Sequence, residues 1–169
     1  PLIAKFYRPG RWSDEALQEE HDFTAELAER DIPAVVPLAN GAGQTLRISE
    51  EGLRFSLYPR IVGRAPDLED DEALAVLGRL LGRIHAVGAL KPFEHRPALA
   101  VASFGQDSRA FLLETGQLPY SLENAYETLS SDLLAIIEER FAACAPETLR
   151  LHGDCHLGNL LWQDGVAHF

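Results

Sequence analysis

The chain has 169 residues, of which 46% are hydrophobic and 24% charged, the values of an ordinary globular protein with room for one core or two small lobes. Its 26 acidic and 15 basic residues give a net charge of −11, which argues against a nucleic-acid or anionic-membrane surface. No apolar run approaches the roughly 20 residues of a membrane span, and the two cysteines form no disulfide framework, so we expect reduced thiols in a cytoplasmic protein.

The first third of the chain predicts strands and one helix. The apolar and aromatic run 2–7, interrupted by Lys5, suits a strand. Ser13 is a good N-cap, and the two acidic residues after it favour a helix that runs to about residue 30. Segments 44–49 and 53–62 then read as two strands joined by a Gly-containing turn.

The remainder predicts mostly helices. Ala65-Pro66-Asp67 interrupts the pattern, after which apolar residues recur at helical spacing over 70–87. We expect a short helix over 109–115 and a long one over 121–145. A short strand over 149–152 should then lead into the last motif of the chain.

These elements indicate an α+β protein with two lobes. A small β-rich N-lobe is expected over 1–62, and a larger helical C-lobe over 63–169 that carries its chemistry on loops. A linker near residues 58–67 joins the two.

A charged pair is predicted between the first strand and the first helix. Ala16, Glu20, Phe23 and Leu27 recur on one helix face, so Glu20 lies in the middle of an apolar stripe. An ionised carboxylate that faces a core is costly unless it is paired, and Lys5 is the obvious partner. Kinases hold the α- and β-phosphates of ATP with a strand Lys that a helix Glu supports. The alternative is a solvated Lys5 and a helix rotated so that Glu20 reaches water.

The segment 151–160 carries the strongest chemical signal. Asp154 is followed five residues later by Asn159, the pattern with which a kinase places its catalytic base and a magnesium ligand. The Asp would accept the proton of an attacking hydroxyl, and the Asn would offer a neutral oxygen to a magnesium ion that bridges the ATP phosphates. An Asp164-Gly165 turn between apolar runs predicts a hairpin behind this loop. The alternative is two ordinary loop residues that cap turns.

Two neighbouring features leave alternatives open. His152 and His156 could bind a metal if they lay on a helix, but Gly153 and Gly158 favour a loop that His152 supports by hydrogen bonding. Tyr58 starts the linker, where backbone N–H and C=O groups could hold an adenine ring. The alternative for Tyr58 is an ordinary connection between lobes.

Taken together, these residues resemble the aminoglycoside phosphotransferase and choline kinase superfamily of protein-kinase-like enzymes. The likeness rests on the block His152-Gly153-Asp154-x-His156-x-x-Asn159 and on the helical segment Leu81-Gly82-Arg83-Ile84-His85. Within the superfamily the chain looks closer to the RdoA/YihE-like stress response kinases, which are bacterial Ser/Thr protein kinases. The stretches that carry this closer likeness are Ala4-Lys5-Phe6-Tyr7-Arg8-Pro9, Glu19-Glu20-His21, His95-Arg96-Pro97 and Leu149-Arg150-Leu151-His152-Gly153-Asp154-Cys155-His156.

The resemblance implies a bilobal kinase-like fold that uses ATP and Mg²⁺ to phosphorylate protein Ser or Thr, with autophosphorylation and a role in a cytoplasmic stress response. It implies that Lys5 binds the ATP phosphates, that Glu20 supports Lys5, that Asp154 is the catalytic base and that Asn159 is a magnesium ligand. We expect a monomer with a protein substrate or a small hydroxyl substrate, and neither a nucleic-acid nor a membrane partner.

The family's glycine-rich loop and its second magnesium-binding Asp do not occur in this sequence, so we expect a fold truncated at both ends. Two alternative functions stay open. One is a small-molecule kinase that acts on an aminoglycoside, choline or a homoserine-like alcohol. The other is a non-catalytic pseudokinase that binds a partner.

Overall fold

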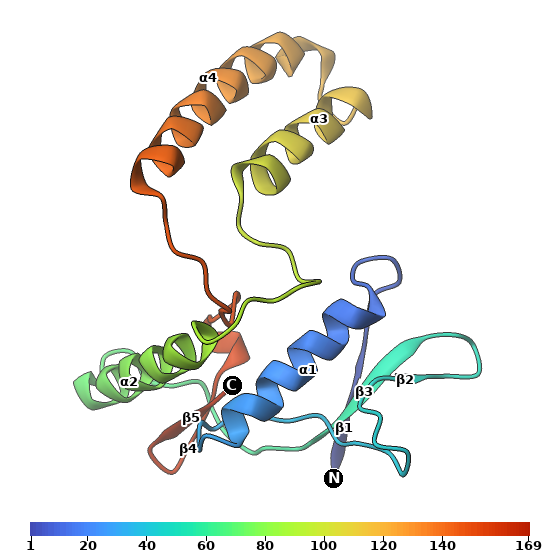
Figure 1. Ribbon diagram of the computed structural model, residues 1–169, viewed down its shortest axis with the longest axis vertical. Helices are drawn as coiled ribbons and strands as arrows, with labels where there is room; N and C mark the ends of the chain where they lie inside the picture. Colours follow the sequence, from blue (N-terminus) through green and yellow to red (C-terminus); the bar gives the residue numbers. More distant parts are fainter. The chain divides into compact units, whose positions relative to one another are not determined.

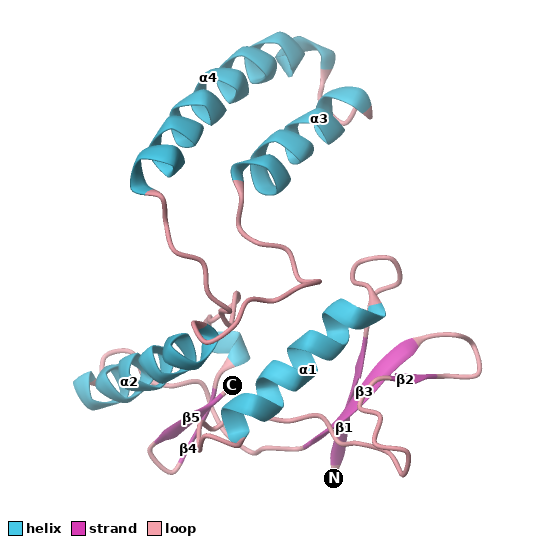
Figure 2. Cartoon of the chain, viewed as in Figure 1, coloured by secondary structure: helices cyan, strands magenta, loops and turns pink.

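The chain divides into two compact units in the computed structural model, which describes residues 1–169. The first unit joins Pro1–Arg96 to Leu149–Phe169, and the second, called the helical unit below, comprises Pro97–Thr148. Both strands and helices are present, so the α+β prediction is confirmed (Figure 2). The lobe division at residue 62 stays a prediction.

The first unit contains a three-stranded antiparallel sheet in the order β1-β3-β2 (Figure 1). Its strands are β1 (Leu2–Phe6), β2 (Arg47–Ile48) and β3 (Arg54–Pro59), the last two shorter than predicted. The register pairs Lys5 with Ser56, so both side chains lie on one face of the sheet.

Two helices supply the core of this unit. Helix α1 (Asp14–Ala28) begins after Ser13, whose hydroxyl accepts a hydrogen bond from the Ala16 N–H at 3.1 Å. Helix α2 (Asp71–Gly88) begins after Asp70, which accepts from the Glu72 N–H in the same way. One buried cluster joins the end of α1 to the end of α2: Phe23, Leu27, Ile32, Ile84 and Val87.

The predicted hairpin is confirmed. Strands β4 (Leu161–Gln163) and β5 (Val166–His168) are antiparallel. The turn residues Asp164 and Gly165 have φ values of 51° and 79°, the pair of left-handed conformations that a tight type I′ turn requires. A second buried cluster packs this hairpin on α2: Leu77, Leu80, Leu160 and Ala167.

The predicted strand over 149–152 is wrong, because this segment has no sheet partner. The Arg150 N–H instead donates to the Gly88 carbonyl at the end of α2, at 3.2 Å. The approach of the two chains is so close that a Cβ on Gly88 would lie 2.1 Å from the Arg150 carbonyl oxygen. The segment is therefore anchored to a helix terminus rather than to a strand.

The helical unit is a hairpin of two helices. Its helix α3 (Asp107–Glu114) follows an unpredicted π-helical segment, η1 (Ala102–Gln106), and is connected to α4 (Tyr120–Cys144). Figure 1 shows α3 and α4 side by side, and Arg109 of α3 donates to the Ser130 hydroxyl of α4 at 2.9 Å. Neither helix buries any residue. None of the helices in the structure is both long and apolar enough to span a membrane.

Candidate active site

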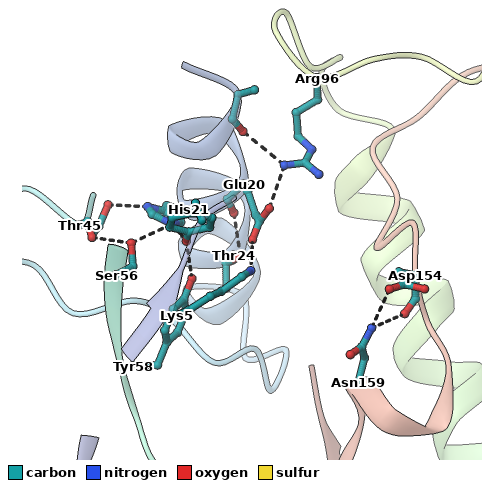
Figure 3. Close-up of polar contacts among 12 residues, drawn as sticks. Lys5, Glu20, His21, Thr24, Thr45, Ser56, Tyr58, Arg96, Asp154 and Asn159 are labelled. Atoms are coloured by element: carbon teal, nitrogen blue, oxygen red, sulfur yellow. Dashed lines mark hydrogen bonds and ion pairs between the residues drawn. The ribbon is translucent and has the colours of Figure 1, made fainter. Parts of the chain in front are cut away.

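The predicted pair between β1 and α1 forms. Lys5 Nζ lies 2.9 Å from Glu20 Oε1 (Figure 3). The Lys5 side chain is 49% exposed, and such pairs contribute at most about 1 kcal/mol to stability. The pair is therefore more significant for where it holds the ammonium group than for how much it stabilises the fold.

The charge on Glu20 is set by its surroundings. Burial opposes ionisation of this carboxyl group, but the cations of Lys5 and Arg96 outweigh it and hold the pKa of Glu20 below its ordinary value. The neighbouring residues on the predicted apolar stripe, Ala16, Phe23 and Leu27, are buried. Glu20 is thus an ionised group set in an apolar helix face, as its position in the sequence indicated.

Asp154 and Asn159 also lie together. Asn159 Nδ2 donates to the Asp154 backbone carbonyl at 2.9 Å and to Asp154 Oδ2 at 3.0 Å. The loop reverses at Gly153, whose φ of 79° suits glycine, and ends in a single 3₁₀ turn, η2 (Leu157–Asn159). The Asp154 side chain is 76% exposed and is accessible to an incoming hydroxyl group.

The loop histidines have the supporting contacts of a loop and not those of a metal site. His152 Nδ1 accepts the Asp154 N–H at 3.3 Å, and its ring packs edge-on against Phe169. His156 Nδ1 accepts the Gly158 N–H at 3.0 Å. Each imidazole therefore fixes the backbone two residues further along the loop.

The pKa of His152 is shifted by its surroundings. Burial lowers the pKa of His152, while the carboxylates of Asp154 and Glu20 act in the opposite direction and the Lys5 cation reinforces the effect of burial. The Lys5–Glu20 pair and the Asp154–Asn159 pair both lie in the first unit. No hydrogen bond or ion pair directly joins them (Figure 3).

A magnesium ion would find suitable but incomplete ligands here. Mg²⁺ prefers hard oxygen donors in octahedral geometry and usually keeps several waters and substrate phosphates. The Asn159 amide oxygen is a donor of this kind, and Asn159 Nδ2 holds the neighbouring Asp154 carboxylate at 3.0 Å. No group of three or more His, Cys, Asp or Glu residues is arranged to hold a metal ion. The residues fit an ion that phosphates and water help to coordinate.

Tyr58 lies within β3 rather than beyond it. Its hydroxyl is 3.1 Å from the Tyr7 hydroxyl, and burial together with that hydrogen bond raises the pKa of Tyr58. The Tyr7 N–H donates to Arg54 O, and the Arg60 N–H donates to Pro1 O. In an antiparallel pair of strands, every second pair of opposite residues is hydrogen-bonded through the backbone. Since the opposite pairs 7/54 and 1/60 are hydrogen-bonded, the pair Ile3–Tyr58 between them is hydrogen-bonded as well. The Tyr58 backbone and the Arg60 N–H are therefore engaged in this pairing, and the adenine contact predicted at Tyr58 stays a prediction.

Sequence reasoning missed two groups that hold this region together. The Glu19 carboxylate accepts three consecutive backbone N–H groups of residues 94–96, at 2.6 to 2.9 Å. Arg150 is 3% exposed and donates to Glu26 Oε2 at 2.7 Å and to the Val87 carbonyl at 3.0 Å. The position of Arg150 between two leucines just before the loop was a usable signal of a buried arginine. Nothing in the sequence pattern indicated that the Glu19 carboxylate would bind backbone N–H groups.

A strand lysine held by a helix carboxylate, with an Asp–Asn loop that leads into a hairpin, defines a protein-kinase-like fold. A family model described as "Phosphotransferase enzyme family" matches residues 1–167, and the chain belongs to this family.

Curated relatives agree with this assignment. The chain is 36% identical over 164 residues to "Serine/threonine protein kinase RdoA" of Salmonella typhimurium and 34% identical to "Stress response kinase A" of Escherichia coli K12. Each match covers 97% of this chain and 49% of the relative. The chain therefore spans about half the length of the curated relatives it matches.

Solved structures share the fold at low identity. An amicoumacin kinase in complex with AMP-PNP, Ca²⁺ and Ami aligns with a TM-score of 0.71 and 16% identity, covering 99% of this chain and 50% of the other. The AMP-bound spectinomycin phosphotransferase APH(9)-Ia aligns with a TM-score of 0.63 and 15% identity, covering 99% and 57%. These likenesses establish the protein-kinase-like fold.

Proposed function

We propose that this chain provides the phosphate-binding lysine and the catalytic loop of an ATP-dependent phosphotransferase that acts on protein Ser or Thr hydroxyls. The observation that carries the proposal is the 2.9 Å pair between Lys5 of β1 and Glu20 of α1. In a family of phosphotransferases, this pair has a clear use in binding ATP.

Lys5 is the residue that binds the α- and β-phosphates in this proposal. Glu20 accepts one hydrogen bond from its ammonium group, which leaves the other two N–H donors for phosphate oxygens. Because Glu20 binds the ammonium on the side of α1, part of the rotamer entropy of Lys5 is already lost before ATP binds. The adenine contact on the backbone of segment 58–60, which begins with Tyr58, stays a prediction.

Asp154 is the proposed catalytic base. Asn159 and His156 both approach Oδ2, at 3.0 and 3.8 Å, so Oδ1 is the oxygen left to accept a proton. The substrate hydroxyl loses its proton to Oδ1 as its oxygen forms a bond to the γ-phosphorus and the bond to the ADP oxygen breaks. A magnesium ion bound by Asn159 and the ATP phosphates would neutralise the charge on the transferring group.

The names of the relatives support a protein substrate. One relative at 36% identity is named a serine/threonine protein kinase, whereas the antibiotic kinases that share the fold are only 15–16% identical. Autophosphorylation, a cytoplasmic location and a monomeric state also remain predictions.

The proposal is tested with Asp154→Ala in the complete encoded protein. Loss of a positioned general base slows transfer by roughly 10²–10⁴-fold, while the exposed position of Asp154 should leave the circular dichroism spectrum unchanged. Asp132→Ala, on an exposed part of α4, is the matched control and should retain wild-type turnover. Near-normal turnover of the Asp154 variant would refute the assignment.

The substrate is identified with ATP labelled in its γ-phosphate, offered with a generic protein and, in parallel, with a panel of aminoglycosides, choline and homoserine. Label in the protein supports the Ser/Thr kinase. Label in the small alcohols alone rejects it in favour of a small-molecule kinase. Nucleotide binding without any transfer favours a non-catalytic protein.

A further inference from the structure

The Glu20 carboxylate has two cationic partners, one for each oxygen. Oε1 accepts from Lys5 at 2.9 Å, and Oε2 accepts from Arg96 Nη1 at 2.8 Å (Figure 3). Since the two cations bind different oxygens, Arg96 does not displace Lys5. It instead fixes the rotation of the carboxylate so that Oε1 faces the lysine.

Arg96 is itself held on several sides. Its guanidinium lies over the Trp12 ring at 4.6 Å, and Nη1 also reaches the Ala16 carbonyl at 3.4 Å. Its side chain is 22% exposed, against 49% for Lys5. Pro97 follows and restricts the Arg96 backbone to extended conformations. The arginine is therefore the more rigid of the two cations that Glu20 binds.

The neighbouring carboxylate binds the backbone of the same segment. Glu19 Oε1 accepts the Glu94 N–H at 2.6 Å, and Glu19 Oε2 accepts the N–H groups of His95 and Arg96, both at 2.9 Å. Although burial opposes ionisation, these three N–H groups hold the pKa of Glu19 below its ordinary value. Glu19 thus binds the backbone of segment 94–96, and Glu20, the next residue of α1, binds the side chain of Arg96.

We propose that Arg96 is a positioning residue for the Lys5–Glu20 pair, and that Glu19 secures it by fixing segment 94–96 on α1. An exposed Lys–Glu pair alone is too weak to hold two long side chains in one geometry. A second cation with its own anchors removes that freedom, so that Lys5 is directed before ATP arrives. The inference deepens the proposed function and rests on it for its effect on ATP use.

The contact is tested first without any enzymatic assay, in the complete encoded protein. The Glu20 carboxyl carbon is titrated by NMR in the wild type and in Arg96→Gln, Arg96→Lys and Arg54→Gln. Arg54 is the matched control because it binds α1 through Asp14 Oδ1 at 2.6 Å and is 17% exposed. It has no contact with Glu20.

Arg96→Gln should raise the pKa of Glu20, Arg96→Lys should restore most of the difference, and Arg54→Gln should leave the pKa of Glu20 as in the wild type. An unchanged Glu20 titration in Arg96→Gln overturns the inference. So does an equal change in Arg54→Gln, because the effect would then come from a general loosening of α1.

Kinetics then separate positioning from folding. Arg96→Gln should lower kcat/KM for ATP by about tenfold, mostly through KM, because Glu20 keeps Lys5 but in a less defined geometry. Arg96→Lys should recover part of the loss, and Arg54→Gln should match the wild type. If the wild type is active and Arg96→Gln uses ATP equally well, the inference fails and the proposed function stands. If the wild type transfers no phosphate, the proposed function fails and the titration alone decides the role of Arg96.

Discussion

The ion pair between Arg150 and Glu26 should dominate the stability of the segment that carries the catalytic loop. Arg150 is 3% exposed, its guanidinium lies over the Phe23 ring at 4.2 Å, and Nη1 is 2.7 Å from Glu26 Oε2. Its Nε is buried without a hydrogen-bond partner. The hydrogen bond from Arg150 also lowers the pKa of Glu26. Because Nε of this buried cation has no partner, the stability of the segment depends strongly on the contacts of Nη1 with Glu26 and of Nη2 with the Val87 carbonyl.

Glu26→Gln leaves this guanidinium facing a neutral amide. Breaking a buried pair from one side costs about 3–5 kcal/mol, and the lower end applies because the Val87 carbonyl and the Phe23 ring remain. Arg150→Met should cost less, about 1.5 kcal/mol, because the carboxylate left behind is partly solvated and methionine fills most of the space. The prediction that Glu26→Gln destabilises the protein more than Arg150→Met is a stricter test than either magnitude alone.

The measurement is urea unfolding of the complete encoded protein, followed by circular dichroism. Glu127→Gln is the control, because it removes a 3.7 Å pair with Arg109 in which Glu127 is 58% exposed, and it should cost less than about 0.5 kcal/mol. A Glu26→Gln cost no larger than that of the control refutes the reasoning. So does an Arg150→Met variant less stable than Glu26→Gln.

Two further predictions concern packing and pH. Gly88→Ala should destabilise the protein by about 1–3 kcal/mol, because its Cβ would lie 2.1 Å from the Arg150 carbonyl oxygen. Gly78→Ala on the same helix has open space around its Cβ and should stabilise the protein by up to about 1 kcal/mol. Urea unfolding checks both variants, and equal effects would contradict the close approach at Gly88. Burial lowers the pKa of His21, so the unfolded chain binds the proton more readily, and the free energy of unfolding should fall as pH drops below the ordinary value of 6.5. His21→Gln should flatten that slope in unfolding measured between about pH 7.5 and 5, and an unchanged slope would show that His21 does not contribute to it.

Much of the fold could be predicted because its elements carry local signals. Ser13 at the start of α1 and the Asp164-Gly165 turn specify structure through nearby backbone atoms, and both were located from sequence. The wrong strand over 149–152 had an equally good local pattern of alternating residues. What overrode it was the end of α2, where Gly88 lets the Arg150 backbone approach and bind. A partner far away in sequence decided the conformation, and a local pattern does not encode it.

The candidate site shows the same division at the level of single side chains. Glu20 and Lys5 could be paired from sequence because each is a lone charge in an apolar setting, and a desolvated charge requires a partner. Glu19 faces off the apolar stripe, where a carboxylate normally meets water, so its sequence position requires no partner at all. Its partners are backbone N–H groups, which every residue but proline carries and which no residue type reveals. For this reason the lysine that is proposed to bind ATP was visible in the sequence, whereas the segment that we infer to hold it in place became visible only in the structure.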